Sequence, residues 1–172
     1  ADQTPSLARK FTMAGKSGLN ITKDESLEEL MMAVNCPQLD PILTEFDASA
    51  VQDWAKGLGQ EIFTGTSGRV FPVAMKASPL LRAWLARLSD VALKKTWRWE
   101  GFTETGHLFQ TPEGPQEVSP KATIFALGGA SWARLGADGT WADTFRAAGM
   151  EVAPFAPANM GVQVCWSPHM EP

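Results

Sequence analysis

The feature that most constrains the fold is an almost wholly apolar run at residues 121–127, Lys-Ala-Thr-Ile-Phe-Ala-Leu, which stops at Gly128-Gly129. A strand reads as a continuous apolar run when both of its faces are buried, as in a parallel sheet. Paired glycines after such a strand let backbone amides approach a ligand at the carboxyl end of the sheet, where open α/β folds bind nucleotides. The run therefore predicts an α/β fold with a ligand site at this strand end.

Helical patterns precede and follow this run. Ser26 and Glu29 form a capping box before an amphipathic stretch, and residues 47–58 repeat apolar side chains at helical spacing before Gly59. Ser78 and Pro79 predict the start of a third helix, with Ser78 as its N-cap and with a buried stripe of Leu80, Leu81, Trp84, Leu85 and Leu88. Residues 138–148 predict a fourth helix.

Shorter segments predict strands and loops. Residues 93–102, 107–111 and 115–118 are separated by turn residues and predict a small antiparallel three-stranded meander. Residues 151–154 and 161–166 read as further strands. Residues 14–22 hold two glycines, a lysine and short polar side chains. They predict a loop that wraps a cofactor, with a plain flexible connection as the alternative.

Composition narrows the class of partner. The formal charge of -4 disfavours nucleic acid and anionic membranes, so a small-molecule substrate is expected. Cys36 and Cys165 lie far apart and suggest neither a disulfide framework nor a metal site, which fits a reducing, cytoplasmic setting. Residues 24–61 hold nine carboxylates and one lysine, whereas residues 66–98 hold seven Lys or Arg and one Asp. We expect these blocks to be solvated faces that attract each other, with a binding patch as the alternative.

Several catalytic motifs are absent. Gly15-Lys16-Ser17 resembles the end of a P-loop, but Lys10 stands where that motif needs its first glycine. The chain has neither a Gly-x-Gly-x-x-Gly fingerprint nor a Gly-x-Ser-x-Gly elbow, and we expect His107 and His169 to be ordinary surface residues. Tryptophans 54, 84 and 141 fall on helical core faces, which favours packing over sugar stacking.

Three segments together resemble one family. They are Ala8 to Thr22, the run Ser67-Gly68-Arg69-Val70-Phe71-Pro72 with Lys76-Ala77-Ser78, and Ala126-Leu127-Gly128-Gly129-Ala130-Ser131. The order and spacing of these segments are similar to those of bacterial NAD(P)/FAD-dependent oxidoreductases, also described as NAD(FAD)-utilising dehydrogenases and related to aminoacetone oxidase. Gly18-Leu19 stand where the commonest family form has Arg-Cys.

The resemblance implies FAD as the cofactor and a glutathione-reductase-type FAD-binding domain. It implies that residues 1–156 are part of that domain and that residues 157–172 start an inserted second domain. Arg69 and Lys76 are candidates for an anionic substrate, with surface ion pairs to the acidic block as the alternative. The resemblance implies these cofactor contacts: Arg9, Lys10, Ala14, Gly15, Gly18, Asn20, Thr22, Trp99, Ala126, Leu127, Gly128 and Gly129.

The family begins with a strand, a glycine fingerprint and a helix, none of which stands in this sequence. We therefore expect an internal fragment of a flavoenzyme in which flavin accepts a hydride from an organic donor. The fragment alone is expected to be inactive and to purify without flavin, because its phosphate cradle is incomplete. The sequence identifies no catalytic acid or base and no oligomeric state. The alternative is a cofactor-free fold remnant or interaction module.

Overall fold

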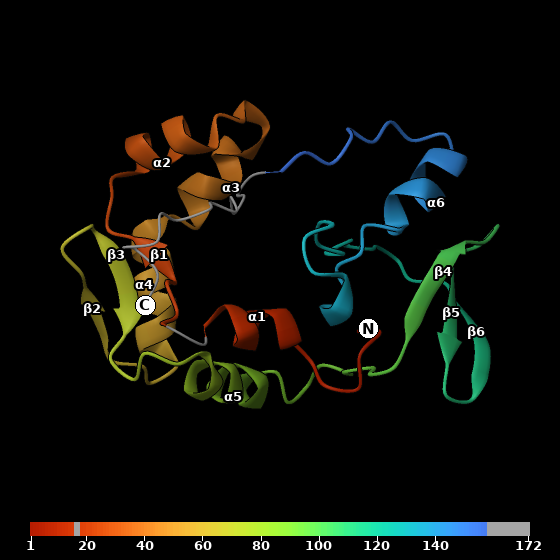
Figure 1. Ribbon diagram of the computed structural model, residues 1–172, viewed down its shortest axis with the longest axis horizontal. Helices are drawn as coiled ribbons and strands as arrows, with labels where there is room; N and C mark the ends of the chain where they lie inside the picture. The colour runs from red at the N-terminus through yellow and green to blue at the C-terminus, as the bar shows by residue number, and fades with distance from the viewer. Residues whose placement is uncertain (16–17, 158–172) are drawn as a thin grey trace, which may run out of the picture. The chain divides into compact units, whose positions relative to one another are not determined.

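The computed structural model describes residues 1–15 and 18–157, which divide into two compact units (Figure 1). The first unit is Ala1–Val118 and the second is Ser119–Pro172. Several predictions fall outside the described residues. They are the strand at residues 161–166, all of the proposed inserted domain except residue 157, and the residues Lys16, Ser17, Cys165 and His169. The predicted domain boundary at 156/157 stays a prediction.

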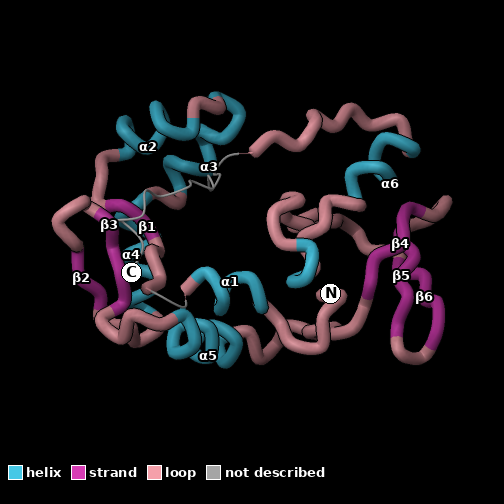
Figure 2. Tube along the Cα trace, in the orientation of Figure 1, coloured by secondary structure: helices cyan, strands magenta, loops and turns pink. Residues whose placement is uncertain are grey.

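The first unit contains helices and two small sheets (Figure 2). Its helices are α1 (Arg9–Ala14), α2 (Leu27–Val34), the 3-10 turn η1 (Pro37–Leu39), α3 (Asp40–Glu45), α4 (Ala48–Gly57) and α5 (Ala77–Arg87). One sheet has the order β1-β3-β2, formed by Thr22–Lys23, Arg69–Pro72 and Ile62–Thr64, and both of its pairings are antiparallel. Its strands are only two to four residues long, and the sequence patterns predicted none of them.

The second sheet confirms the predicted meander. Strands β4 (Arg98–Phe102), β5 (His107–Thr111) and β6 (Gly114–Val118) pair antiparallel in sequence order. The first strand starts later than the predicted residue 93 because Thr96 has a φ of 58°, which is outside the extended region. A register shift between Trp99 and Gly101 gives β4 a bulge.

The core of the first unit lies between α1, α4, α5 and the β1-β3-β2 sheet. Its buried residues are Leu19, Ala55, Leu58, Ala77 and Leu80, and Phe11, Ile21, Trp54, Ile62 and Ala83 pack against them. Trp54 and Trp84 meet edge to face with ring centroids 5.3 Å apart, which confirms the packing role predicted for both. Trp84 nevertheless remains 36% exposed, so only part of its ring is in the core.

Two of the predicted helices begin with a side-chain cap. Ser26 accepts a hydrogen bond from the Glu29 amide and the Glu29 carboxylate accepts one from the Ser26 amide, so the capping box before α2 is confirmed. Asp47 caps α4 by accepting from the Ala50 amide, 2.8 Å away. The prediction for α5 was wrong at its start, because Lys76 holds the N-cap position and Ser78 lies inside the first turn.

The second unit contains the 3-10 turn η2 (Ala133–Leu135) and helix α6 (Trp141–Ala147). Helix α6 starts three residues after the predicted position 138, because Asp138 instead accepts hydrogen bonds from the amide and hydroxyl of Thr140. The Asp138 side chain is thereby committed to a turn before the helix.

The predicted buried strand at residues 121–127 is wrong for this structure, as is the strand at 151–154. Neither segment has strand structure, and Ile124 is 93% exposed. A parallel strand forms only where neighbouring strands accept its backbone hydrogen bonds, and the described residues of this unit contain no other strand to do so. The apolar run therefore has no regular secondary structure and belongs to no sheet. None of the described helices is long and apolar enough to cross a bilayer.

Candidate cofactor site

The first sequence motif folds into the end of a helix. Arg9 and Lys10 lie in the first turn of α1, which residue patterning did not predict, and Ala14 is its last residue. Gly15 follows as the C-cap, and its amide donates to the carbonyl of Phe11. A Cβ added at the buried Gly15 would lie 2.6 Å from the Cβ of Ala77, at the start of α5. Gly15 is thus required for the close packing of α1 on α5.

The residues on either side of Asn20 are held in place by the rest of the first unit. Leu19 is 5% exposed and belongs to the core, and the Ile21 amide donates to the carbonyl of Val70 at 3.0 Å. Asn20, between them, is exposed. Gly18 has a φ of +138°, which other residues rarely adopt, so it provides the bend before Leu19. The segment therefore presents Asn20 to solvent from a fixed backbone.

The first and second motifs lie side by side. In the β1-β3 ladder, Thr22 pairs with Val70 and Lys23 pairs with Arg69, while Gly15 contacts Ala77. Arg69 and the neighbouring Lys76 are exposed. The predicted attraction between the charge blocks does not take the form of ion pairs, because no ion pair between described residues joins the two.

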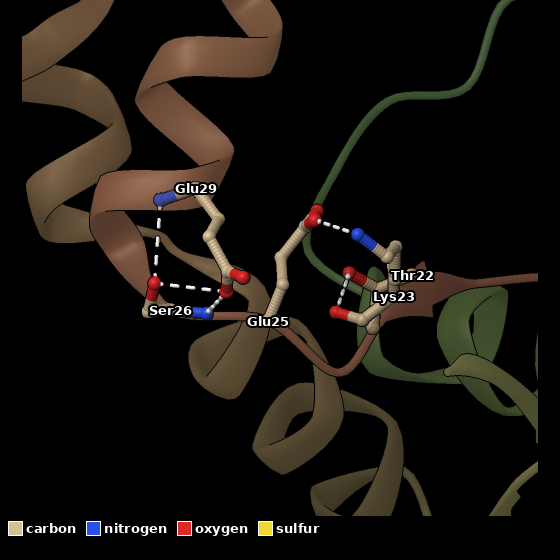
Figure 3. Close-up of polar contacts among 5 residues, drawn as sticks. All are labelled: Thr22, Lys23, Glu25, Ser26 and Glu29. Carbon is tan, nitrogen blue, oxygen red and sulfur yellow. Dashed lines mark hydrogen bonds and ion pairs between the residues drawn. The ribbon is translucent and has the colours of Figure 1, made fainter. Parts of the chain in front are cut away.

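Polar contacts fix the chain just after Thr22 (Figure 3). The Lys23 ammonium pairs with the Glu25 carboxylate, and that hydrogen bond raises the pKa of Lys23 above its usual value. The hydrogen bond from the Ser26 backbone amide lowers the pKa of Glu29. These contacts hold the path from β1 into α2, and thereby the exit from the segment that presents Asn20.

The third motif lies in the second unit as an irregular turn. Gly128 has a φ of 75°, and its carbonyl accepts a 3.0 Å hydrogen bond from the Trp141 indole of α6. A Cβ added at Gly129 would meet nothing within 4 Å. Ala126 is exposed and Leu127 is partly buried. The turn is held from one side by Trp141, while the space next to the Gly129 Cα is open.

Aromatic packing supports this turn within the second unit. The ring of Trp141 meets those of Phe145 and Phe155 edge to face, and Phe125 meets Phe145 in the same way, with centroid distances of 5.0 to 5.8 Å. Gly139 is buried, and a Cβ there would lie 2.7 Å from Phe155 and 2.8 Å from Ala130. Trp141 and Gly139 therefore position the Gly128-Gly129 turn, a role that the sequence reading did not assign to either.

The structure thus brings some of the predicted contacts together. In the first unit, Ile21 and Thr22 lie beside Val70 of β3 and Gly15 lies beside Ala77 of α5, and residues 126–129 form a turn in the second unit. Trp99 lies in the meander, where its ring packs against Phe102 and His107. Its predicted contact with the cofactor stays a prediction, as do the predicted cofactor contacts of residues 9–22 and 126–129. Among the described residues, no group of three or more His, Cys, Asp or Glu could hold a metal ion.

Comparison with known proteins defines the class to which this fold and these turns belong. The chain carries a Rossmann-type dinucleotide-binding domain of the α/β class. Its family is that of the HI0933-like protein Rossmann domain, whose model matches residues 1–165, and the chain belongs to it. This is a family of FAD/NAD(P)-binding, oxidoreductase-like proteins. No curated protein matches the chain.

Proposed function

We propose that this chain forms part of the FAD-binding domain, of the glutathione-reductase type, of an oxidoreductase related to the aminoacetone oxidase-like flavoproteins. The flavin, when bound, accepts a hydride from an organic small-molecule donor. The chain's own residues bind and orient the cofactor. The observation that carries the proposal is Gly129, whose Cα faces open space in a turn that Trp141 holds through the Gly128 carbonyl.

The backbone at this turn fits a flat, phosphate-linked ligand. A glycine with no neighbour within 4 Å of its missing Cβ costs conformational entropy without a packing reason inside the chain. Gly57 in α4 has the same open space, but Gly129 follows the apolar run in the Gly128-Gly129 motif, where a ligand that approaches the main chain closely supplies that reason. The neighbouring Ala126 adds little side-chain bulk. In the first unit, Asn20 is exposed and offers an amide that donates and accepts hydrogen bonds.

The experiment is a titration of FAD into the full-length product of the gene, followed by flavin fluorescence. Gly129→Ala should weaken FAD binding about tenfold, because a methyl group blocks close backbone approach. Gly57→Ala is the matched control, since its added Cβ also meets nothing within 4 Å. The control should bind FAD as the unmodified protein does.

Two results would contradict the proposal. One is full FAD affinity in the Gly129→Ala protein, which would mean that the cofactor does not approach this turn. The other is a protein that binds no FAD at all, which would favour a cofactor-free interaction module. Gly129→Ala is a cleaner probe than any change at Gly128, because the positive φ of Gly128 strains other residues whether or not a ligand is present.

A further inference from the structure

One face of the β1-β3-β2 sheet points away from the core. Along β3, Val70 and Pro72 are buried, while Arg69 is exposed and Phe71 is half-buried. Residues opposite each other across a ladder share a face, and the register pairs Lys23 with Arg69 and Phe63 with Phe71. We call these four residues the outer sheet face.

The outer sheet face carries two opposed cations. Like charges directly opposite each other across a ladder destabilise a sheet, so the pairing of Lys23 with Arg69 has a cost in stability. Glu25 offsets part of it by pairing with Lys23, but the Glu25 side chain is only 11% exposed while that of Lys23 is 53% exposed. The Lys23 side chain therefore offers more surface to an approaching anion than the Glu25 side chain does. Arg69 is exposed and forms no ion pair with a described residue.

A stacked aromatic pair lies next to the cations. The rings of Phe63 and Phe71 stack at 28° with centroids 5.8 Å apart, and Phe63 is 42% exposed. Glycines flank the Phe71 ring, because the position of a Cβ on Gly65 would lie 3.6 Å from it and one on Gly18 would lie 3.9 Å from it. The absence of a side chain at Gly65 leaves one edge of the ring less covered, whereas the Met75 side chain lies 2.9 Å from the Cβ position at Gly18.

We propose that the outer sheet face binds a small planar aromatic anion. An aromatic ring of the ligand stacks on Phe63, and its anionic group lies against Arg69 and Lys23. Such a ligand comes either from the nucleotides, which join a base to phosphate, or from the aromatic carboxylates. The residues of this face belong to the first unit and differ from those of the Gly128-Gly129 turn, and the inference goes beyond the proposed FAD binding.

The test uses anilinonaphthalene sulfonate, a planar aromatic anion whose fluorescence rises when it binds. We expect saturable binding to the protein at low ionic strength, weakened about five- to tenfold in Arg69→Gln by loss of one charge contact. Phe63→Ala should weaken binding similarly, and Arg69→Lys should retain most of it. Arg82→Gln removes an exposed cation of α5 and should change the affinity less than about twofold. Circular dichroism checks that each variant is folded.

Competition identifies the source of the ligand. Displacement of the probe by ADP supports a nucleotide, and displacement by anthranilate supports an aromatic carboxylate. The inference is overturned if Arg69→Gln and Phe63→Ala, both folded, bind the probe as tightly as the unmodified protein does. It is also overturned if Arg69→Gln loses FAD affinity in parallel, because the face would then belong to the cofactor site while the proposed function stood.

Discussion

Replacing Gly15 with alanine tests the contact between the end of α1 and the start of α5. Gly15 has φ −85° and ψ 15°, which alanine adopts without strain, so the effect of the change comes from the added methyl group. That methyl would lie 2.6 Å from the Cβ of Ala77 and 3.2 Å from its amide nitrogen. Carbon atoms pack at about 3.5 Å or more, so the first contact is too short by about 0.9 Å.

Neither atom in this contact can rotate away, because each is a Cβ or part of the backbone. The helices must move apart, and such overpacking costs about 1–3 kcal/mol of unfolding free energy. Urea unfolding followed by near-UV circular dichroism measures the loss, since Trp54 and Trp84 pack edge to face in the same core. Gly57→Ala is the control and should be neutral or more stable by up to about 1 kcal/mol, because alanine favours the helix.

A second variant shows whether the loss of stability comes from the clash with Ala77. Ala77→Gly removes the opposing methyl group, so Gly15→Ala should cost less in that background, with a coupling energy of about 1 kcal/mol or more. The reasoning is refuted if Gly15→Ala changes the unfolding free energy by no more than Gly57→Ala does. It is also refuted if the two changes at positions 15 and 77 are additive.

Four further outcomes are expected. Ser26→Ala removes the side-chain cap of α2 and should cost about 1 kcal/mol in urea unfolding. The pKa of Glu29 is lowered in the folded state, so its carboxylate stabilises the fold fully above the usual pKa of 4.5 and loses this effect as the pH falls through the lowered pKa. Acid titration of the unfolding free energy should show this loss of stability, and the loss should be smaller in Ser26→Ala. Gly139→Ala, at φ +76° and 2.7 Å from Phe155, should expose residues 119–157 to limited proteolysis, whereas an unchanged cleavage rate would contradict the packing described. Thr103→Val should return the pKa of Glu117 toward its usual range in an NMR titration, since the Thr103 hydroxyl is the main cause that lowers it; an unshifted carboxyl resonance would disagree.

The helices that the sequence predicted well are those with local signals. Ser26 with Glu29, and Asp47, satisfy backbone amides within three residues of themselves, so the information for α2 and α4 lies in the sequence around each start. The start of α5 was placed wrongly because Pro79 suggested the first helical position. The first turn lacks intrahelical partners for its amides in any case, so proline is tolerated as its third residue too.

The strands could be predicted only in the meander, where strands and short turns alternate along the sequence. The meander has strands of five residues joined by short turns, and it was found. Strands β1, β2 and β3 have two to four residues, too few to show alternation, and the β1-β3 pairing joins residues far apart in the chain. The strand predicted at 121–127 was wrong for a different reason. Its local pattern is strong, but the described residues offer it no partner strand.

In the candidate site too, local sequence predicts some features and contacts between distant residues set the others. Gly15 and Gly129 look alike in sequence as glycines next to a cofactor motif, but the first is packed against Ala77 and the second faces open space. Only three-dimensional packing separates these two uses of glycine. Lys23 opposite Arg69 could not be found from sequence either, because the register of β1 on β3 sets that contact.

Hydrogen-deuterium exchange on the full-length protein, with and without bound FAD, tests the central claim most directly. If both cofactor segments contact FAD, amides of residues 18–22 and 126–129 should exchange more slowly in the FAD-loaded protein, while those of β6 should not change. Stoichiometric FAD binding with unchanged exchange in both segments would contradict the account.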